Sequence, residues 1–437
     1  MKGKKKAVEK KHLTAVNKPE PEELALEYHS YYKGKIEIGL KAPVRSYDDF
    51  AIWYTPGVAE PSRRIRDSRE RVFEYTNKGN FVAIVTDGTR VLGLGDVGAE
   101  AALPVMEGKA MLFKYLGGVD AFPICLATRD AEEIIKAVKW MAPSFGGVNL
   151  EDIESPKCYY ILEKLREELS MPVWHDDQQG TALVILAGLI NALKVVGKNL
   201  SEIAISLIGA GAANVNVAKY MHVAGAKWEN MVVVDSRGVL NEDREDVKGD
   251  KNKWGICGKT NKEGRRGGIK EAMRDTDVCI ALSTPGPGVI KREWVAGMAD
   301  GAIVFACANP VPEIWPWEAE EGGARIVATG RSDFKNQLNN SLGFPAVFRG
   351  VLDVRATCIT EEMCMAAADA IARYAEEKGI SEGYIIPGME ESEMYVCEAV
   401  AVGMKAIEQG VAERKMSVEE LEEEARKRIF SKTSKSF

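Results

Sequence analysis

The sequence lacks the closely spaced cysteines that a disulfide framework or a zinc site would need. Its eight cysteines are dispersed without any C-x-x-C pair, and most fall in apolar segments typical of strands or helices. This pattern favours reduced thiols in the core of a cytoplasmic protein over a set of disulfides.

The chain also lacks an apolar run long enough to cross a membrane. The longest run, residues 182–196, is interrupted by Asn191 and Lys194 and is shorter than the roughly 20 residues that a bilayer requires. We expect a buried helix there. A secretory signal is missing too, because the basic start is followed by residues 9–21 with little apolar content.

Charge of one sign is not in strong excess. The formal net charge is −7, and the basic residues are spread along the chain apart from six lysines among the first eleven residues. No face for nucleic acid is evident. We expect residues 1–21 to form a flexible basic tail, with weak contact to anionic partners as the alternative.

Length and composition indicate an ordinary globular protein of more than one domain. Hydrophobic residues make up 46% of the chain and charged residues 28%. Because single cores rarely exceed about 250–300 residues, a chain of 437 residues should divide into two units with a cleft between them.

Three carboxylates suggest a metal site. Residues 148–153 are predicted as a strand whose end carries Glu151 and Asp152, and Asp177 follows the predicted strand 172–175. Ligands gather outside the carboxyl ends of parallel strands, so these acids can meet in one crevice. Oxygen ligands without thiolates suit a hard cation such as Mg²⁺ or Mn²⁺.

Two simpler interpretations of these acids stay open. Asp176 and Asp177 could cap the helix predicted at residues 181–196. Glu151 and Asp152 could be solvated loop residues. The spacing supports a metal site without excluding either alternative.

A dinucleotide fingerprint follows in the second half. A strand ends in the turn Gly209-Ala210-Gly211-Ala212-Ala213-Asn214, a helix follows, and Asp235 ends the next strand. In this order the backbone meets a pyrophosphate at the helix N-terminus, and the acid, about 20 residues on, binds the ribose 2′-hydroxyl. A tight turn without a ligand is the alternative. Asn214 replaces the third glycine, so we expect looser packing there.

The same segment bears on coenzyme choice. Asp235 would repel the 2′-phosphate of NADP, whereas Arg237, two residues later, could accommodate it. We therefore favour NAD over NADP.

Strands alternate with helices along most of the chain, which predicts the α/β class. We expect an N-terminal α/β domain for substrate and metal at residues 22–175. A doubly wound Rossmann-type NAD(P)-binding domain with C-terminal helices follows at 176–410, and a charged helical segment, frayed at its end, at 411–437.

Seven short motifs stand out along residues 25–410. They are Tyr54-Thr55-Pro56-Gly57, Thr86-Asp87-Gly88 with Gly93-Leu94-Gly95-Asp96, Gly108-Lys109, Leu150-Glu151-Asp152, residues 175–181, Ala308-Asn309-Pro310 and Asn339-Asn340. In this order they resemble the motifs of the malic enzymes, in the short form of bacteria and archaea.

The resemblance implies oxidative decarboxylation of (S)-malate to pyruvate and CO₂, with reduction of NAD or NADP and a need for Mg²⁺ or Mn²⁺. It implies that Glu151, Asp152 and Asp177 hold the metal against the C2 hydroxyl and C1 carboxylate of malate, with Asp176 behind them. It also implies a homodimer, although no interface can be recognised in the sequence.

The resemblance assigns the proton transfers to Lys109 and Tyr54. Lys109 would take the hydroxyl proton as hydride leaves C2, and Tyr54 would protonate enolpyruvate at C3. A lysine base needs a depressed pKa, which we expect from burial and the nearby cation. By pattern alone, Lys109 would be a solvated helix residue and Tyr54 a packing residue.

Three further residues match positions that bind substrate or coenzyme. Asn309 and Asn340 match contacts to substrate or to the nicotinamide ribose, although each amide could equally satisfy buried backbone. Arg90 matches an arginine that binds a malate carboxylate in the larger animal and plant enzymes, and it could pair with a carboxylate through two hydrogen bonds.

Other functions remain possible on this scaffold. A metal-assisted hydroxy-acid dehydrogenase would oxidise its substrate without losing CO₂, and a decarboxylase could prefer oxaloacetate. A non-catalytic nucleotide sensor is the alternative from another class. The three carboxylates together with Lys109 and Tyr54 favour the enzyme.

Overall fold

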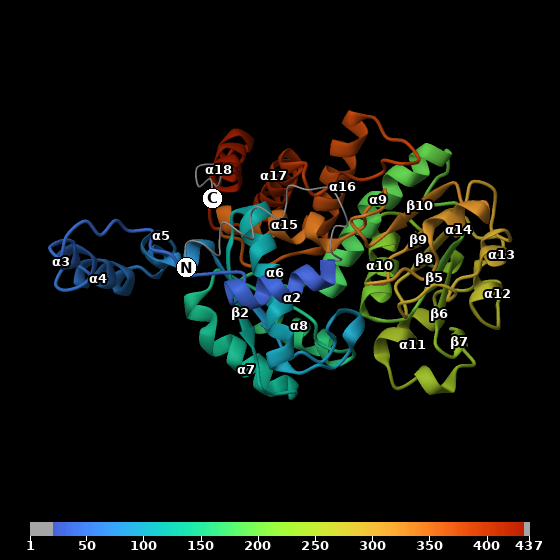
Figure 1. The fold of residues 1–437 in the computed structure, drawn as a ribbon, viewed down its shortest axis with the longest axis horizontal. Helices are drawn as coiled ribbons and strands as arrows, with labels where there is room; N and C mark the ends of the chain where they lie inside the picture. The colour runs from blue at the N-terminus through green and yellow to red at the C-terminus, as the bar shows by residue number, and fades with distance from the viewer. Residues whose placement is uncertain (1–20, 432–437) are drawn as a thin grey trace. The chain divides into compact units, whose positions relative to one another are not determined.

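Residues 21–431 are described by the structure, a computed structural model of the chain (Figure 1). Residues 1–20 of the expected basic tail (residues 1–21) lie outside the described residues, and Pro21 begins a helix. Contacts divide the chain into two compact units, Met1–Leu40 and Lys41–Phe437. The described part of the first unit contains α2 (Pro21–Tyr32).

The larger unit contains a first sheet of four parallel strands in the order β2-β1-β3-β4. β1 and β3 are apolar and largely buried, as expected for parallel strands covered on both faces. The strand predicted at 148–153 already ends at Leu150, so Glu151 and Asp152 lie just beyond it. The elements are β1 (Phe81–Thr86), α6 (Ala99–Gly117), β2 (Asp120–Cys125), α7 (Ala131–Met141), β3 (Gly147–Leu150), α8 (Lys157–Glu168) and β4 (Val173–His175).

A second sheet has six strands in the order β10-β9-β8-β5-β6-β7. All pairs are parallel except β6 with the edge strand β7, which was not predicted. This arrangement confirms the predicted doubly wound α/β fold. The elements are β5 (Ile205–Ile208), α10 (Ala212–Val223), β6 (Met231–Asp235), β7 (Gly238–Val239), α11 (Lys251–Cys257), α12 (Ile269–Met273), β8 (Val278–Ala281), α13 (Arg292–Val295), β9 (Ile303–Ala306), α14 (Pro316–Glu321) and β10 (Ile326–Thr329).

Helix α9 (Thr181–Val196) joins the two halves. It follows a single π-helical turn, η6 (Asp176–Gly180), and packs against α10 and α16. Together with that turn it is the one helix among the described residues that is long and apolar enough to cross a membrane, and most of it is buried inside the protein. One continuous apolar core extends from the first sheet past α9 to the second. The domain boundary after residue 175 therefore stays a prediction.

Four helices complete the fold: α15 (Phe344–Asp353), α16 (Glu361–Lys378), α17 (Ser392–Glu408) and α18 (Val418–Phe430). The charged C-terminal segment forms α18, and its end, where fraying is predicted, is not among the described residues. Ser417 and Glu420 form a capping box at the start of α18, and its face of Leu421, Ala425 and Ile429 is buried. Residues 432–437 lie outside the described part.

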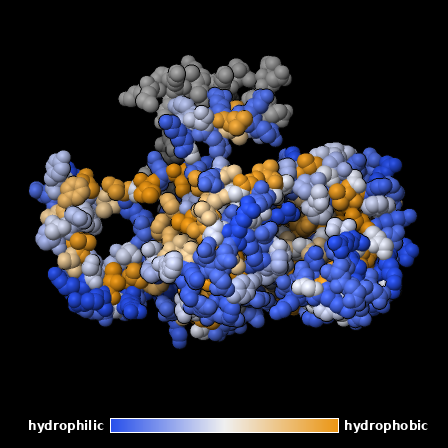
Figure 2. All heavy atoms as spheres, turned by 90° about the horizontal axis from the view of Figure 1, so that it is seen from below, coloured by the Kyte–Doolittle hydropathy of each residue, from blue (hydrophilic) through white to orange (hydrophobic). Residues whose placement is uncertain are grey.

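Near the start of the larger unit, α3 (Asp49–Trp53) and α4 (Ala59–Asp67) form an arm that projects beyond α5 (Val72–Tyr75) in Figure 1. Hydrophobic side chains gather on this projecting part in Figure 2. The large exposed apolar residues of the arm are Tyr47, Phe50, Ile52, Trp53, Tyr54 and Val58. Exposed apolar sets of this kind are typical of interaction surfaces.

A buried ion pair ties the C-terminal helices to the first sheet. Arg349 on α15 donates to Asp353 through Nε at 2.9 Å and Nη2 at 2.5 Å, and both side chains are almost fully buried. The Nη1 group of Arg349 donates to Oδ1 of Asn80 at 2.6 Å, directly before β1. The amide of Asn80 in turn donates to the Gly118 carbonyl after α6.

We expect removal of either charge to destabilise the protein strongly. Asp353→Leu or Arg349→Met leaves an unpaired buried charge, which costs about 3–5 kcal/mol of unfolding free energy. The double variant should be less destabilised than either single variant, because no lone charge remains. Urea unfolding followed by circular dichroism measures this, with the exposed pair Arg325 and Glu382 as the control. Single variants as stable as the wild type would refute the expectation.

Candidate active site

The three predicted metal-binding carboxylates meet at one edge of the first sheet. Leu150 of β3 lies opposite His175 of β4 in the parallel register, so the residues that follow each strand emerge side by side. One carboxylate oxygen from each of Glu151, Asp152 and Asp177 lies within 4.8 Å of the others. The structure therefore brings together the acids that the strand-end argument predicted.

The backbone of Asp152 orients two of these acids. Asp152 has φ of +52°, a left-handed conformation that is uncommon for residues other than glycine. Its N–H donates to Oδ2 of Asp177 at 2.9 Å, and its carbonyl accepts from the N–H of Arg90 at 3.0 Å. Contacts with the loops after β1 and β4 thus hold Asp152 in this backbone conformation. Such a conformation costs about 1–3 kcal/mol of folding free energy.

Lys109 extends from α6 into the same cluster. Its Nζ pairs with Oδ2 of Asp176, lies 3.0 Å from Oε1 of Glu151, and sits 4.0 Å from the centre of the Phe344 ring. The side chain is 8% exposed, so it is not the solvated helix lysine that its pattern alone suggests. Asp176 contacts Lys109 and accepts from Trp174 Nε1 at 3.0 Å, behind the three acids.

The pKa of Lys109 differs from the sequence-based expectation. Burial alone would lower it, but the carboxylates of Asp176 and Glu151 outweigh burial and raise the pKa. A base near neutral pH needs a lower pKa, so the charges of Asp176 and Glu151 beside Lys109 oppose that role.

The charge balance of the cluster fits a divalent cation. Glu151, Asp152, Asp176 and Asp177 face one lysine. Burial raises the pKa of Glu151 well above its usual range, and the neighbouring acids add to this against the effect of Lys109. Oxygen donors with excess negative charge are the environment that Mg²⁺ and Mn²⁺ favour.

Two residues of this region were missed as site residues. Burial lowers the pKa of His175 to about 4, so its imidazole is neutral beside Asp177. Asp87 accepts from the N–H and hydroxyl of Thr89 and pairs with Lys157 at 2.6 Å. Both belong to motifs that the sequence displays, but the burial of His175 and the pairing of Asp87 with Lys157 of α8 depend on tertiary packing.

The glycine turn of the second sheet is built as a dinucleotide site requires. Gly209 has φ of +99°, and a Cβ there would lie 2.5 Å from the Leu282 carbonyl oxygen. A Cβ on Gly211 would meet open space just before α10 begins at Ala212. Backbone and helix N-terminus are thus open to an anionic ligand.

The expected looser packing at Asn214 is wrong. Asn214 is buried, and its amide donates to the carbonyls of Ile208 at 2.9 Å and Gly209 at 2.8 Å. The side chain therefore ties the helix back to the end of β5.

Asp235 lies at the end of β6, as predicted, but its carboxylate is paired with Arg244. Sequence reasoning missed this arginine, because it lies in an irregular segment nine residues away. Arg237 is exposed and donates to Asp246 at 3.1 Å.

The two sheets approach each other through the loop that follows β1. A Cβ at Gly93 would lie 2.6 Å from the carbonyl oxygen of Asn309, so the loop and Asn309 are in direct contact. Asn340 lies beside Gly180 at the end of η6, where the carboxylate of Asp176 also approaches. The side chain of Arg90 is exposed.

Tyr54 stands apart from this group. It ends α3 on the projecting arm and is 70% exposed. The arm extends away from α9 and the turn before it in Figure 1.

Comparison with known proteins agrees with this geometry. The family models for the malic enzyme N-terminal domain and the malic enzyme NAD-binding domain match residues 33–166 and 178–408. The chain is 48% identical over 409 residues to the bifunctional malic/malolactic enzyme of Bacillus subtilis, covering 93% of this chain and 98% of that one. It is 49% identical over 381 residues to an NAD-dependent malic enzyme of Geobacillus stearothermophilus, covering 87% and 78%.

A solved structure is similar over the same range. The crystal structure of malic enzyme from Pyrococcus horikoshii shares 52% sequence identity with this chain at a TM-score of 0.88. The match covers 93% of this chain and 95% of that one.

We expect Glu151→Gln and Asp177→Asn each to weaken Mn²⁺ binding at least about tenfold, because each removes one charged ligand. Titration calorimetry with Mn²⁺ alone measures this. Glu154→Gln is the matched control, since Glu154 is an exposed carboxylate three residues from Glu151. Equal Mn²⁺ affinity in Glu151→Gln and wild type would exclude Glu151 as a ligand.

Proposed function

The chain belongs to the malic enzyme family, and we propose that the cluster around Lys109 carries out the family's reaction. This reaction is the oxidative decarboxylation of (S)-malate to pyruvate and CO₂, with reduction of NAD or NADP. The observation that carries the proposal is the position of Lys109, buried among carboxylates beside the predicted metal site.

Glu151, Asp152 and Asp177 would hold a divalent cation, with Asp176 orienting Lys109 behind them. When bound, the cation supplies Lewis-acid stabilisation of negative charge on the substrate oxygens. Trp174 supports Asp176 from the buried side. The acids would thus bind the cation and orient Lys109, and Lys109 would be the group that exchanges a proton.

Lys109 would accept the C2 hydroxyl proton while hydride leaves C2 for the nicotinamide. The C3–C4 bond then breaks, CO₂ departs, and the electron pair forms the enolate of pyruvate. Tyr54 would return a proton to C3. A positioned acid or base of this kind typically contributes about 10²–10⁴-fold to the rate.

Substrate and coenzyme would meet between the two sheets. Arg90, Asn309 and Asn340 would bind malate, with Asn309 also reaching the nicotinamide ribose. The direct contact of Gly93 with Asn309 supports this, because it brings the substrate side and the coenzyme side together.

The pyrophosphate of the coenzyme would lie on the open glycine turn and the N-terminus of α10. The residues involved are Gly209, Gly211, Ala212, Ala213 and Asn214, with Asp235 beside the adenosine ribose. All eight cysteines are free, which supports a reducing compartment such as the cytoplasm.

We propose that the protein forms a homodimer in which the arm of one copy reaches the site of the other. Tyr54 is exposed together with Phe50 and Trp53 on this arm. On α6, the helix that carries Lys109, Leu103 and Met111 are exposed as well. Covering these apolar faces with a second copy would bury them and would supply the missing proton donor.

Lys109→Ala should lower kcat for malate oxidation at least about 100-fold, because the base is lost. Coenzyme binding, followed by NADH fluorescence, should be unchanged. Lys114→Ala is the matched control on the same helix, since Lys114 is half exposed and pairs with Asp120. Substantial turnover by Lys109→Ala would remove Lys109 from the mechanism.

The stoichiometry of the reaction separates the decarboxylating enzyme from a simple dehydrogenase. We expect one CO₂ for each NADH or NADPH formed from malate. Reduced coenzyme without CO₂ would instead identify a hydroxy-acid dehydrogenase that keeps the carboxylate.

Sharing of the site between subunits can be tested with two inactive variants. Tyr54→Phe and Lys109→Ala are expected to be inactive as homodimers. A purified hybrid of the two would contain one site with both residues intact, and it should show about half of the wild-type activity. A hybrid as inactive as its parents would contradict a shared site.

A further inference from the structure

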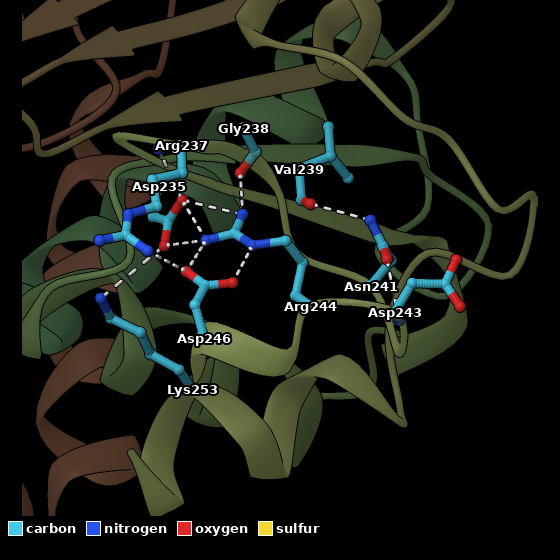
Figure 3. A network of polar contacts seen from close by, with 9 residues as sticks. All are labelled: Asp235, Arg237, Gly238, Val239, Asn241, Asp243, Arg244, Asp246 and Lys253. Carbon is cyan, nitrogen blue, oxygen red and sulfur yellow. Dashed lines mark hydrogen bonds and ion pairs between the residues drawn. The ribbon is translucent and has the colours of Figure 1, made fainter. Parts of the chain in front are cut away.

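The carboxylate expected to select NAD is already occupied by an arginine. Arg244 lies between Asp235 and Asp246 in Figure 3. Its Nη2 donates to Oδ2 of Asp235 at 3.0 Å and to Oδ1 at 3.1 Å, and its Nη1 donates to Oδ1 at 3.1 Å. The side chains of Asp235 and Arg244 are only 9% and 14% exposed, so water screens this pair weakly.

Further contacts hold Arg244 in this position. Its Nε donates to Oδ1 of Asp246 at 2.7 Å, and Nη2 donates to Oδ2 at 2.8 Å. Nη1 also donates to the Gly238 carbonyl in β7. All three guanidinium nitrogens are engaged, so the planar group is locked against Asp235.

Asp235 has little remaining capacity to act on a coenzyme. Besides Arg244, its Oδ1 accepts from the N–H of Arg237 at 2.9 Å, and Lys253 Nζ lies 3.9 Å from Oδ2. The repulsion of a 2′-phosphate that an isolated carboxylate would exert is therefore offset by the adjacent cations.

A cavity of about 660 Å³ opens beside this pair, at the end of β6 where the adenosine part of a dinucleotide binds. Its charged lining residues are Arg237, Arg244 and Arg266 against Asp235 and Asp243. Ser236 adds a hydroxyl. A cavity of this size holds a nucleotide. With Asp246, which pairs with Arg237 and Arg244, and Lys253 beside Asp235 included, four cations face three carboxylates, and this balance favours an additional phosphate.

We propose that Arg244 determines coenzyme specificity: by neutralising Asp235 it opens this cavity to the 2′-phosphate of NADP, so the protein uses NADP as well as NAD. The proposal rests on the function given above. Ser236 and the exposed side chain of Arg237 are the groups closest in sequence to Asp235 that can bind the phosphate. This revises the preference for NAD that Asp235 suggested from the sequence alone.

The test compares the binding of NADPH and NADH, followed by their fluorescence in the absence of malate. Wild type should bind the two with Kd values within about tenfold of each other. Arg244→Gln exposes the charge of Asp235, and it should raise the Kd of NADPH relative to that of NADH at least about tenfold. Asp235→Asn should shift the ratio in the opposite direction, because the arginine is then unopposed.

The double variant Asp235→Asn/Arg244→Gln separates charge from structural damage. It removes both charges, so its Kd ratio should return to within about threefold of wild type. Competition by adenosine 2′,5′-bisphosphate against AMP should follow the same order, because these two probes differ only in the 2′-phosphate. Arg292→Gln, in an exposed pair on α13, is the control and should leave the ratio unchanged.

Two results would overturn the proposal. One is a wild type that binds NADPH more than about 100-fold more weakly than NADH. The other is an Arg244→Gln variant with the wild-type ratio of Kd values or, if that variant does not fold, an Asp235→Asn variant with the wild-type ratio. Loss of the proposed function is distinguishable, because it would abolish malate turnover while coenzyme binding persists.

Discussion

One ammonium group buried among four carboxylates is the interaction on which the arrangement of this protein depends. Lys109 comes from α6, Glu151 follows β3 and Asp176 follows β4, so the ion pairs join three elements of the first sheet. The ring of Phe344 covers Lys109 and connects the C-terminal helices to the same point. One lysine cannot balance four acids, and burial makes the remaining charge costly. A cation bound by these acids would therefore stabilise the fold as well.

The fold was largely predictable because its signals are local. Buried parallel strands have continuous apolar runs, and the acids directly after two of them fall at one sheet edge. The charge state of the site was not predictable in the same way. Lys109 and Asp176 are 67 residues apart, and nothing near Lys109 in the sequence reveals that two carboxylates will raise its pKa. The exposure of Tyr54 likewise depends on how the arm packs, which no local pattern encodes.

In the coenzyme-binding half, local sequence patterns again identified the positions of residues but not the contacts that those residues make. The glycine turn was recognisable because only glycine tolerates the conformation and close approach at Gly209. Asn214, expected to loosen the turn, instead closes it through two hydrogen bonds. At Asp235 the fingerprint identified the right position but not its electrostatic environment, since Arg244 arrives from an irregular segment. A motif specifies where a side chain lies, whereas its partners decide what ligand it tolerates.

One contact between the two halves depends on the absence of a side chain. At Gly93 a single added methyl group would press against Asn309 and Pro310, so the absence of a side chain sets how closely the loop after β1 approaches the second sheet. On the other side, buried Glu313 accepts from the N–H groups of Ser283 at 2.8 Å and Ala308 at 3.0 Å. One carboxylate thus fixes both loops that meet Gly93. Hydride transfer requires reacting atoms about 3–3.5 Å apart, so a fixed approach of these loops would favour it.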